Sequence, residues 1–583
     1  MQKHIEHLRS LYSKYAIDAY VIPSSDEFQN EYPPQKLNRL LWITGFSYSN
    51  GVLIISKDTN IFFTDGRYLL QAKEEIGQYC EILDMYKPGA CKIIGDVLNG
   101  GSLGYDPMLH TVDNLKYYET LASRYNFSMK RIDTNLVDII RCAGSNENIQ
   151  ENSDITVFGI EYAGESHLDK LNKLTAKVET SLDYIFVTRL DSICWLLNIR
   201  GNAVPYTPFP LAYLLLGTKE NTLTLFVDDI TKAKLALLPI FVDNLTILHI
   251  SQIKSEFSKL LESGAKIQLD PSDAASWFLQ NTNKCIIKED PIQLMKAVKN
   301  EVEIDGFKKA HLYEGIAVTE FLAWISSNPG ISEFEASQKL LEFRAQNKEF
   351  LYPSFETISA YGKNAAIVHY KPSLENSSII EESGLYLVDS GGQYYFGTTD
   401  VTRTICIGKP QDEHKVMFTL VLKGHIRLAR AVFPENTRGS QLDSLARFDL
   451  WQHGCNYRHG TGHGVGHFLS VHEGPQSISS GKKIDVALQA GMVLSNEPGF
   501  YKDGEYGIRI ENMLLVIPSK HTGYLEFQNL TAVPIAYDLV DFSMLEQYEK
   551  EWLQNYNKTV YNLIGPFISD QAKKYFSGLL IDL

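Results

Sequence analysis

Residues 458–475 have the sequence RHGTGHGVGHFLSVHEGP, a stretch rich in glycine and histidine. Glycine at every second position from 460 to 466 lets another backbone or a ligand approach closely. The stretch lacks the G-x-x-x-x-G-K-[S/T] frame, so it is not a phosphate-binding loop. Imidazole serves as a metal ligand and as an acid–base group near neutral pH. Four imidazoles in so short a stretch therefore predict a metal or acid–base site. Some of them can still be bystanders, and we expect His467 to be one, as a surface group.

Carboxylates occur at the ends of apolar segments on both sides of this stretch. In VDSGGQYYFGTTDVTR (388–403), Asp389 follows an apolar run, and glycine turns could bring Asp400 back beside it. An exposed acidic hairpin is the alternative. Glu497 ends the apolar run in GMVLSNEPGFY (491–501) and precedes a Pro-Gly turn.

A further carboxylate lies in GIRIENMLLV, residues 507–516. On one strand, Arg509 and Glu511 would face the same side, because side chains alternate with period two. The apolar neighbours predict burial, so Glu511 needs compensation. Pairing with Arg509 is one solution and a metal ion is the other.

Together these segments offer two Asp, two Glu and one or more His, with no thiolate, so a structural zinc site is excluded. Hard oxygen donors with imidazole suit Mn²⁺, Co²⁺, Fe²⁺ or Zn²⁺. Four carboxylates are too many for one divalent ion, whereas two ions would balance them. Two ions about 3.5–4 Å apart lower the pKa of a bridging water and make a nucleophile near neutral pH.

The pattern of apolar segments along the whole chain predicts three domains. Short apolar segments predict strands at 19–23, 41–46, 51–55 and 60–66, with a helix from 68. A similar order recurs at 184–188, 194–201, 211–216 and 223–228, which indicates a weak two-fold repeat. We therefore expect domains at 1–140, 141–290 and 291–583. In the third domain, 294–324 has helical periodicity, strands follow from 357 to 513, and 544–583 forms a docked helical extension.

Composition limits the function further. The 583 residues contain 55 Lys plus Arg and 70 Asp plus Glu, a formal net charge of −15, which weighs against nucleic-acid binding. The longest apolar runs, such as 211–216, are far too short to span a membrane. Seven cysteines form no C-x-x-C pair, and the polar N-terminus shows no secretory signal. We expect a cytoplasmic protein with reduced thiols.

At this point the chain resembles the pita-bread metallopeptidases, and within them the long, three-domain cytosolic Xaa-Pro aminopeptidases. The similarity rests on HGTGHGVG, VHEGP, NEPGFY, GIRIEN and the 389–404 segment. Segments 64–68 and 195–201 are similar to the family's two N-terminal domains, and 530–535 and 552–556 to its C-terminal extension. The resemblance implies two creatinase N-terminal-like α/β domains followed by an α+β pita-bread catalytic domain, with the extension starting at about 524.

The resemblance also implies a chemistry. The family cleaves the bond between an N-terminal residue and a following proline, using two metal ions, expected to be Mn²⁺, and a bridging hydroxide. It implies a homodimer whose partners are peptides with proline in the second position, with no nucleic acid and no membrane. The matched metal ligands are Asp389, Asp400, His463, Glu497 and Glu511.

Further positions match residues that act on the substrate. His369 is similar to a substrate-facing histidine, His459 to a proton shuttle, and His472 to a hydrogen-bond donor near the scissile carbonyl. Glu497 would also carry the proton from the water to the leaving nitrogen. The matched substrate-binding set also includes an arginine that meets the peptide, in the same subunit or across a dimer, and two residues that orient ligands and histidines: Arg67, Arg509 and Tyr501.

Two departures and several rivals accompany this interpretation. The family has Asp where this chain has Ala203, and Asn-Pro where it has Thr207 and Pro208, which puts inter-domain contacts in doubt. Prolidases share the catalytic strings but have one N-terminal domain, and methionine aminopeptidases have none. A creatine-hydrolysing relative has lost the metal ligands. A binding module that keeps the fold without catalysis is the remaining alternative, and all five ligands weigh against it.

Overall fold

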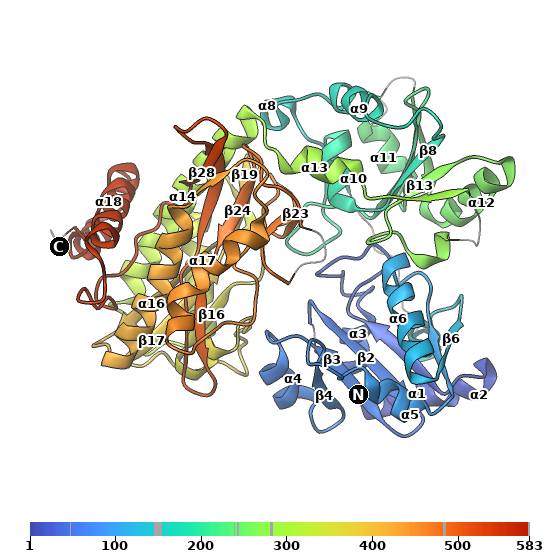
Figure 1. The fold of residues 1–583 in the computed structure, drawn as a ribbon, viewed down its shortest axis with the longest axis horizontal. Coiled ribbons are helices and arrows are strands. Elements are labelled where there is room, and N and C mark those ends of the chain that lie inside the picture. The colour runs from blue at the N-terminus through green and yellow to red at the C-terminus, as the bar shows by residue number, and fades with distance from the viewer. Residues whose placement is uncertain are drawn as a thin grey trace. The chain divides into compact units, whose positions relative to one another are not determined.

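A computed structural model describes residues 1–46, 48–144, 154–237, 240–241, 244–279, 284–481 and 485–580. The chain divides into two compact units (Figure 1). Met1–Ile160 and Glu165–Ile292 form the N-terminal unit, and Glu161–Gly164 and Gln293–Leu583 form the C-terminal unit.

The N-terminal unit begins with a six-stranded sheet of order β4-β3-β2-β1-β5-β6. Strand β1 pairs antiparallel with β2 and parallel with β5. The strands are β1 Ala19–Pro23, β2 Gly51–Ser56, β3 Asn60–Thr64, β4 Glu81–Asp84, β5 Ser102–Tyr105 and β6 Ser128–Arg131. The helices are α1 Gln2–Ser10, α2 Tyr12–Tyr15, α3 Arg39–Thr44, α4 Leu69–Ile76, α5 Lys92–Leu98, α6 Val112–Tyr125 and α7 Leu136–Gly144.

A second six-stranded sheet, of order β12-β11-β10-β8-β13-β14, repeats this topology. Strand β8 pairs antiparallel with β10 and parallel with β13, as β1 does with β2 and β5. The predicted two-fold repeat is therefore confirmed. The strands of this sheet are β8 Tyr184–Val187, β10 Ala212–Gly217, β11 Leu223–Val227, β12 Leu245–His249, β13 Ile267–Leu269 and β14 Cys285–Ile287. A separate two-stranded antiparallel sheet is formed by β7 Ile155–Val157 and β9 Ile199–Gly201. The helices are α9 His167–Thr175, α10 Leu190–Leu197, α11 Ile230–Leu237 and α12 Ile253–Ser263. Helix α8, Ile160–Ala163, falls almost wholly in the stretch assigned to the C-terminal unit.

One predicted strand in each repeat is wrong. Residues 41–46 belong largely to helix α3, and most of 194–201 belongs to α10 before β9 starts. A short apolar run cannot distinguish a buried strand from a buried helix by periodicity. The local signals decide for helix: the Asn38 side chain accepts a hydrogen bond from the Leu41 N–H, and Gly45 ends α3 with φ +87°.

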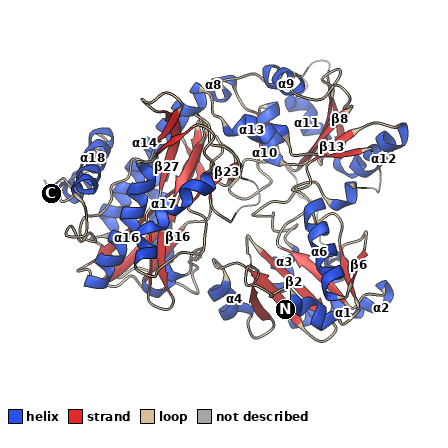
Figure 2. Ribbon diagram, in the orientation of Figure 1, coloured by secondary structure: helices blue, strands red, loops and turns tan. Residues whose placement is uncertain are grey.

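The C-terminal unit places helices beside several antiparallel sheets (Figure 2). Its helices are α13 Pro291–Ala297, α14 Glu301–Ile325, α15 Glu333–Ala345, α16 Asp412–Ala429, α17 Gly439–Gln452, α18 Gln547–Ile564 and α19 Asp570–Ser577. The predicted helix over 294–324 is thus interrupted. A capping box formed by Asn300 and Glu303 starts α14 and separates it from α13.

Two sheets of this unit carry the candidate site. One has the order β16-β17-β20, and the other β21-β28-β27-β24-β22-β23. Their strands are β16 Ile358–Tyr361, β17 Gly384–Ser390, β20 Val401–Ile407, β21 Val432–Pro434, β22 Gly462–Gly464, β23 Glu473–Ile478, β24 Val493–Asn496, β27 Asn512–Pro518 and β28 Tyr524–Asn529. Two smaller sheets contain β15 Phe350–Pro353, β18 Gly392–Tyr394 and β19 Gly397–Thr398, and β25 Gly499–Lys502 and β26 Tyr506–Arg509.

The C-terminal segment is a docked helical extension, as predicted. Leu553, Val560 and Ile564 of α18 are buried in one cluster with Ile426 of α16. The Tyr556 hydroxyl lies 2.9 Å from Nη2 of Arg403 in β20, so the extension also reaches the sheet that carries the site.

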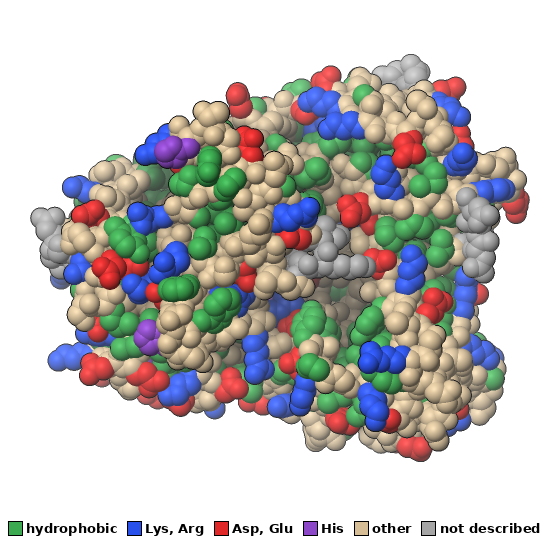
Figure 3. Space-filling view, viewed as in Figure 1, with side chains coloured by type: hydrophobic (Ala, Val, Ile, Leu, Met, Phe, Trp, Pro, Cys, Tyr) green, Lys and Arg blue, Asp and Glu red, His purple; other side chains and the backbone are tan. Residues whose placement is uncertain are grey.

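The described surface is mixed in charge. Figure 3 shows Lys and Arg side chains interspersed with Asp and Glu over the visible face. Among the described residues, none of the helices has the length and apolar character needed to span a bilayer.

Close packing of α16 on α17 yields a stability prediction. A Cβ added to Gly424 would lie 2.1 Å from the Ala446 carbonyl oxygen, which belongs to backbone and cannot move aside. We expect Gly424→Ala to lower the stability of the C-terminal unit by about 1–3 kcal/mol through overpacking, despite alanine's better helix propensity. Thermal unfolding measures the change. Gly578→Ala is the control, because its Cβ would meet Tyr575 O at 3.6 Å, an ordinary contact. Equal midpoints for both variants would contradict the packing argument.

Candidate metal centre

Two aspartates meet at one end of the β16-β17-β20 sheet. Asp389 in β17 is paired in register with Thr402 in β20, and Asp400 immediately precedes β20. Their exposed fractions are 8% and 3%. The antiparallel pairing therefore brings both carboxylates into the interior, and the alternative of an exposed acidic hairpin is wrong.

The larger sheet supplies the other candidate ligands. His463 lies in β22, Glu497 directly follows β24, and Glu511 directly precedes β27. Strand β24 pairs antiparallel with both β22 and β27, which gathers the three residues at one edge. Arg509 and Glu511 do not share a strand as predicted, since β26 ends at Arg509 and β27 begins at Asn512.

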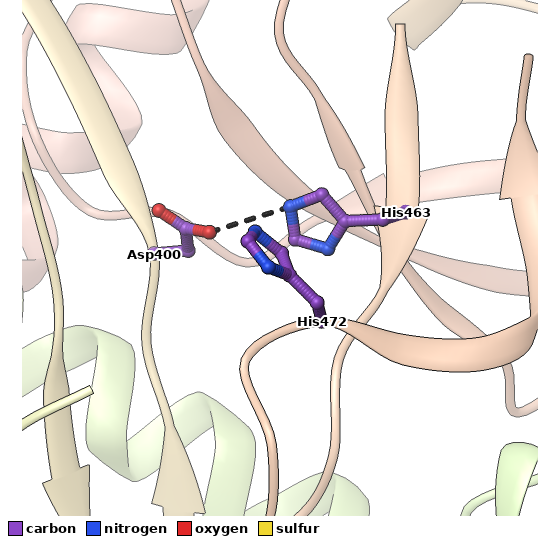
Figure 4. Close-up of side chains that lie close together, drawn as sticks. All are labelled: Asp400, His463 and His472. Atoms are coloured by element: carbon purple, nitrogen blue, oxygen red, sulfur yellow. Dashed lines mark ion pairs between the residues drawn. The ribbon is translucent and has the colours of Figure 1, made fainter. Parts of the chain in front are cut away.

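The structure brings all five predicted ligands and His472 together. Possible ligand atoms lie within 4.8 Å of one another in three sets, which are Asp389, Asp400 and Glu511; His463, Glu497 and Glu511; and Asp400, His463 and His472. Nε2 of His463 is 3.5 Å from Asp400 Oδ2 and 3.8 Å from Glu497 Oε1. Figure 4 shows the His463 and His472 rings and the Asp400 carboxylate, which come from separate segments, close together.

The orientation of His463 suits a metal ligand. Its Nδ1 lies 2.9 Å from the Gly464 carbonyl oxygen, which can only accept, so Nδ1 carries the proton. The lone pair of Nε2 then faces Asp400 and Glu497. A backbone carbonyl that fixes the tautomer in this way is a regular companion of metal-bound histidine.

The electrostatics also fit added cations. Burial, followed by the charges of Asp389 and Glu497, raises the pKa of Asp400 well above its usual range. Burial raises the pKa of Glu511 well above its usual range, and the negative charges of Asp400 and Asp389 raise it further. Oδ1 of Asp389 is buried and has no hydrogen-bond partner among the described residues. Four crowded carboxylates with an unsatisfied oxygen match hard divalent ions, and two such ions would balance their charge.

Arg509 organises one side of this centre. Its Nη2 donates to Asp389 Oδ2 at 2.6 Å, and its Nη1 donates to the Tyr501 hydroxyl at 2.8 Å. Its Nε donates to Thr402 Oγ1 at 3.2 Å. Thr402 in turn donates to Glu511 Oε2 at 2.7 Å. Arg509 therefore forms its ion pair with Asp389, and Thr402 connects it to Glu511.

Sequence reasoning did not identify Thr402 or Ser495. The hydroxyl of Ser495 accepts from the His463 backbone N–H at 2.9 Å. Thr402 stands two residues after Asp400, the spacing that places side chains on the same side of an extended chain, and this spacing could have indicated it. The same spacing could have indicated Ser495, which stands two residues before Glu497.

A hydrogen-bond chain leads from Arg509 to His459. Nδ1 of His459 lies 2.8 Å from the Gly460 carbonyl, so Nδ1 carries the proton and Nε2 accepts from Tyr501 at 2.8 Å. The same ring comes within 3.9 Å of Glu497 Oε2. Hydrogen bonds at both ring nitrogens therefore hold His459 beside Glu497.

The remaining predicted residues lie in different places. His369 is half-buried just after the short helix at Gly362–Ala366. Arg67 belongs to the N-terminal unit and pairs with Asp65 at 2.6 Å. His467 is buried and packs on Phe307, so the expectation of a surface group is wrong. It belongs to none of the three ligand sets among the described residues.

The glycines of 460–466 serve strand packing. A Cβ at Gly462 would lie 2.0 Å from Ser495 O, and one at Gly464 would lie 2.3 Å from Glu473 O. The close approach predicted from the sequence is thus an approach of neighbouring protein backbone. It allows β22 to lie between β23 and β24 with His463 at the site.

Comparisons with known proteins agree with this architecture. Residues 305–518 match metallopeptidase family M24, and 523–577 match the C-terminal region of peptidase M24. Residues 4–142 and 147–303 each match a creatinase/prolidase N-terminal domain. The predicted fold class is confirmed: two creatinase N-terminal-like domains precede a pita-bread catalytic domain with a C-terminal extension.

Individual relatives match over nearly their whole length. The chain is 37% identical over 618 residues to aminopeptidase P2 of Arabidopsis thaliana, with 97% of this chain and 86% of the relative covered. It is 36% identical over 599 residues to a probable Xaa-Pro aminopeptidase P of Laccaria bicolor, with 98% and 91% covered. The solved X-prolyl aminopeptidase of Caenorhabditis elegans, a cytosolic enzyme with a di-nuclear active site, superposes with a TM-score of 0.93 at 31% identity, covering 100% of both chains.

The fold and the ligand set define a metallopeptidase of the M24 class. Within that class, identity above 30% over most of each relative shows that the chain belongs to the aminopeptidase P, or Xaa-Pro aminopeptidase, family.

The position of Arg509 yields a metal-binding prediction. Lysine has one point charge and cannot reach Asp389, Tyr501 and Thr402 together. We expect Arg509→Lys to weaken Mn²⁺ binding about 10–100-fold, as loss of groups that orient ligands does. Calorimetric titration of metal-stripped protein measures it. Arg427→Lys is the control, because the Arg427–Asp449 ion pair contains none of the predicted ligands. Unchanged affinity in Arg509→Lys would contradict a role in holding Asp389.

Proposed function

We propose that this chain is a metal-dependent aminopeptidase that hydrolyses the bond between an N-terminal residue and a following proline. The observation that carries the proposal is the convergence of Asp389, Asp400, His463, Glu497 and Glu511 at one site, where the first two and Glu511 are buried and the other two are half-buried. The names of the relatives supply the Xaa-Pro preference. The di-nuclear site of the C. elegans enzyme supports a two-metal centre here.

The five residues would hold two divalent ions, for which we propose Mn²⁺. Asp389 and Asp400 would bind the first ion, His463 and Glu497 the second, and Asp400 and Glu511 would bridge. When bound, the two ions would supply an activated water as a bridging hydroxide and polarise the scissile carbonyl.

The protein groups around the centre would handle protons and orientation. Glu497 would receive the proton of the attacking water and pass it towards the proline nitrogen. His459 lies 3.9 Å from Glu497 and could relay that proton. His472, whose ring centroid is 4.4 Å from that of His463, would donate to the developing oxyanion. His369 would face the substrate, while Tyr501 and Arg509 hold the ligands and His459 in place.

The proposal extends to peptide contact by the N-terminal unit, to assembly, to location and to domain limits. Arg67 would meet the peptide, the chain would act as a homodimer, and it would reside in the cytoplasm. Domain limits of 1–140, 141–290 and 291–583, with the extension from about 524, are supported by the positions of the four family matches.

A peptide panel tests the function. Metal-stripped protein would be assayed by mass spectrometry on an Xaa-Pro-Yaa tripeptide, an Xaa-Pro dipeptide and a Met-Ala-Yaa tripeptide, with and without Mn²⁺. We expect the first residue to be released from Xaa-Pro-Yaa and from neither of the other peptides. The metal-stripped protein should be inactive until Mn²⁺ is added. Glu511→Gln should lose at least about 10²-fold in kcat, because a bridging carboxylate is removed. Glu505→Gln, which alters a surface ion pair with Lys502, should not change it.

Other outcomes identify the rivals. Cleavage confined to the dipeptide would indicate a prolidase. Cleavage of Met-Ala-Yaa would indicate a methionine aminopeptidase-like specificity. Folded protein that cleaves none of the peptides with any divalent ion would indicate a binding module.

A further inference from the structure

A fully buried carboxylate outside the metal centre collects hydrogen bonds from one long loop. Glu333 is the first residue of α15 and has 0% exposure. Its Oε1 accepts from the Tyr361 backbone N–H at 2.6 Å. Its Oε2 accepts from the Ser378 backbone N–H at 2.7 Å and from the Tyr370 hydroxyl at 2.8 Å. Asn364 Nδ2 lies 3.1 Å and 3.0 Å from the two oxygens.

These donors enclose the segment 361–378, which contains His369. Tyr361 and Ser378 stand at its two ends, and Asn364 and Tyr370 lie within it. All four are neutral donors, so the carboxylate is held by hydrogen bonds and not by a facing cation in the described contacts. Burial raises the pKa of Glu333, while the bonds from Tyr361 and Ser378 oppose that rise. The segment also has internal contacts, which are the short helix at Gly362–Ala366 and a bond of 2.7 Å from the Tyr370 hydroxyl to the Asn376 carbonyl oxygen. Glu333 is the acceptor that joins the two ends of the segment to each other and to α15.

The opposite side of the loop is held from the metal centre. Arg509 Nη2, which donates to Asp389, also lies 3.4 Å from the Val368 carbonyl oxygen. Val368 precedes His369, and Tyr370 follows it. His369 therefore lies between one residue fixed by Arg509 and another fixed by Glu333.

We propose that Glu333 is a positioning residue that fixes the 361–378 loop and thereby aims His369 at the bound peptide. The inference rests on the proposed function, in which His369 faces the substrate. Glu333 acts only through the loop and touches no reacting atom. A tightly placed side chain matters at this point because displacement of about 1 Å can cost about 10²-fold in rate.

A simpler role for Glu333, stabilising the start of α15, is already filled by another residue. Glu335 forms the capping box with Ser332 and accepts from its backbone N–H at 2.8 Å. Both glutamates stand in the first turn, so both complement the helix dipole. Glu335 is exposed, and its hydrogen bonds among the described residues are with Ser332, which makes it a matched control.

A double-mutant cycle tests the coupling on full-length, Mn²⁺-loaded protein. Glu333→Gln replaces an acceptor by an amide that presents N–H groups to the donors. We expect it to lower kcat/KM for Xaa-Pro-Yaa about 10–100-fold without changing Mn²⁺ affinity. In the His369→Ala background the same change should have little further effect, because coupled residues are not additive. Glu335→Gln should leave kcat/KM unchanged in both backgrounds.

Hydrogen exchange supplies a readout that does not depend on activity. In Glu333→Gln, amides of 361–378 should exchange faster while those of 458–475 stay as in the unaltered chain. Glu335→Gln should leave both segments unchanged. If Glu333→Gln fails to fold, Tyr370→Phe, which removes the hydroxyl donor to Glu333, enters the same cycle with a smaller expected loss.

The outcomes separate the two claims. Inactivity of the unaltered chain towards Xaa-Pro-Yaa would overturn the proposed function, and unchanged exchange in 361–378 would overturn the positioning role. If the unaltered chain is active, additive losses in the cycle, or an equal loss in Glu335→Gln, would also overturn the positioning role.

Discussion

Mutual repulsion among buried carboxylates is the constraint on which the C-terminal unit depends. Asp389, Asp400 and Glu511 offer oxygens within 4.8 Å of one another, and Glu497 joins Glu511 in a second set. Such a group is unfavourable in a low-dielectric interior unless cations offset it. The fold holds it together because each carboxylate lies in a strand or beside a strand end whose register is fixed by antiparallel pairing. Arg509 offsets one charge, and the rest of the site is arranged to receive metal ions.

The positions of these carboxylates in the chain explain why part of the candidate site could be predicted from the sequence. A carboxylate at the end of an apolar run is visible in the chain, so Asp389 and Glu497 were identifiable before their neighbours were known. The resemblance supplied His369 and Arg67. The bond between Thr402 and Glu511 joins residues 109 positions apart, and that from Tyr361 to Glu333 depends on how a loop closes. Such contacts follow from tertiary structure and leave no local pattern.

Some elements of the fold could likewise be predicted from the local sequence, and others could not. Strands with clear alternation or apolar runs, such as β1, β2 and β10, formed where expected. Residues 41–46 did not, because the Asn38 cap and Gly45 favoured a helix over a run that suits either state. Glu333 of α15 accepts a hydrogen bond from Tyr370 in the loop that carries His369. Arg509 donates to Val368 of the same loop and to Asp389. Helix, loop and ligand are thus joined by side-chain hydrogen bonds.

Anomalous X-ray scattering from crystals loaded with Mn²⁺, recorded on both sides of the manganese absorption edge, tests the central claim most directly. We expect two peaks per chain, about 3.5–4 Å apart. One should lie among Asp389, Asp400 and Glu511, and the other among Asp400, His463, Glu497 and Glu511. A single peak, or none at these residues in metal-saturated crystals, would contradict the claim that this carboxylate cluster exists to hold a metal pair.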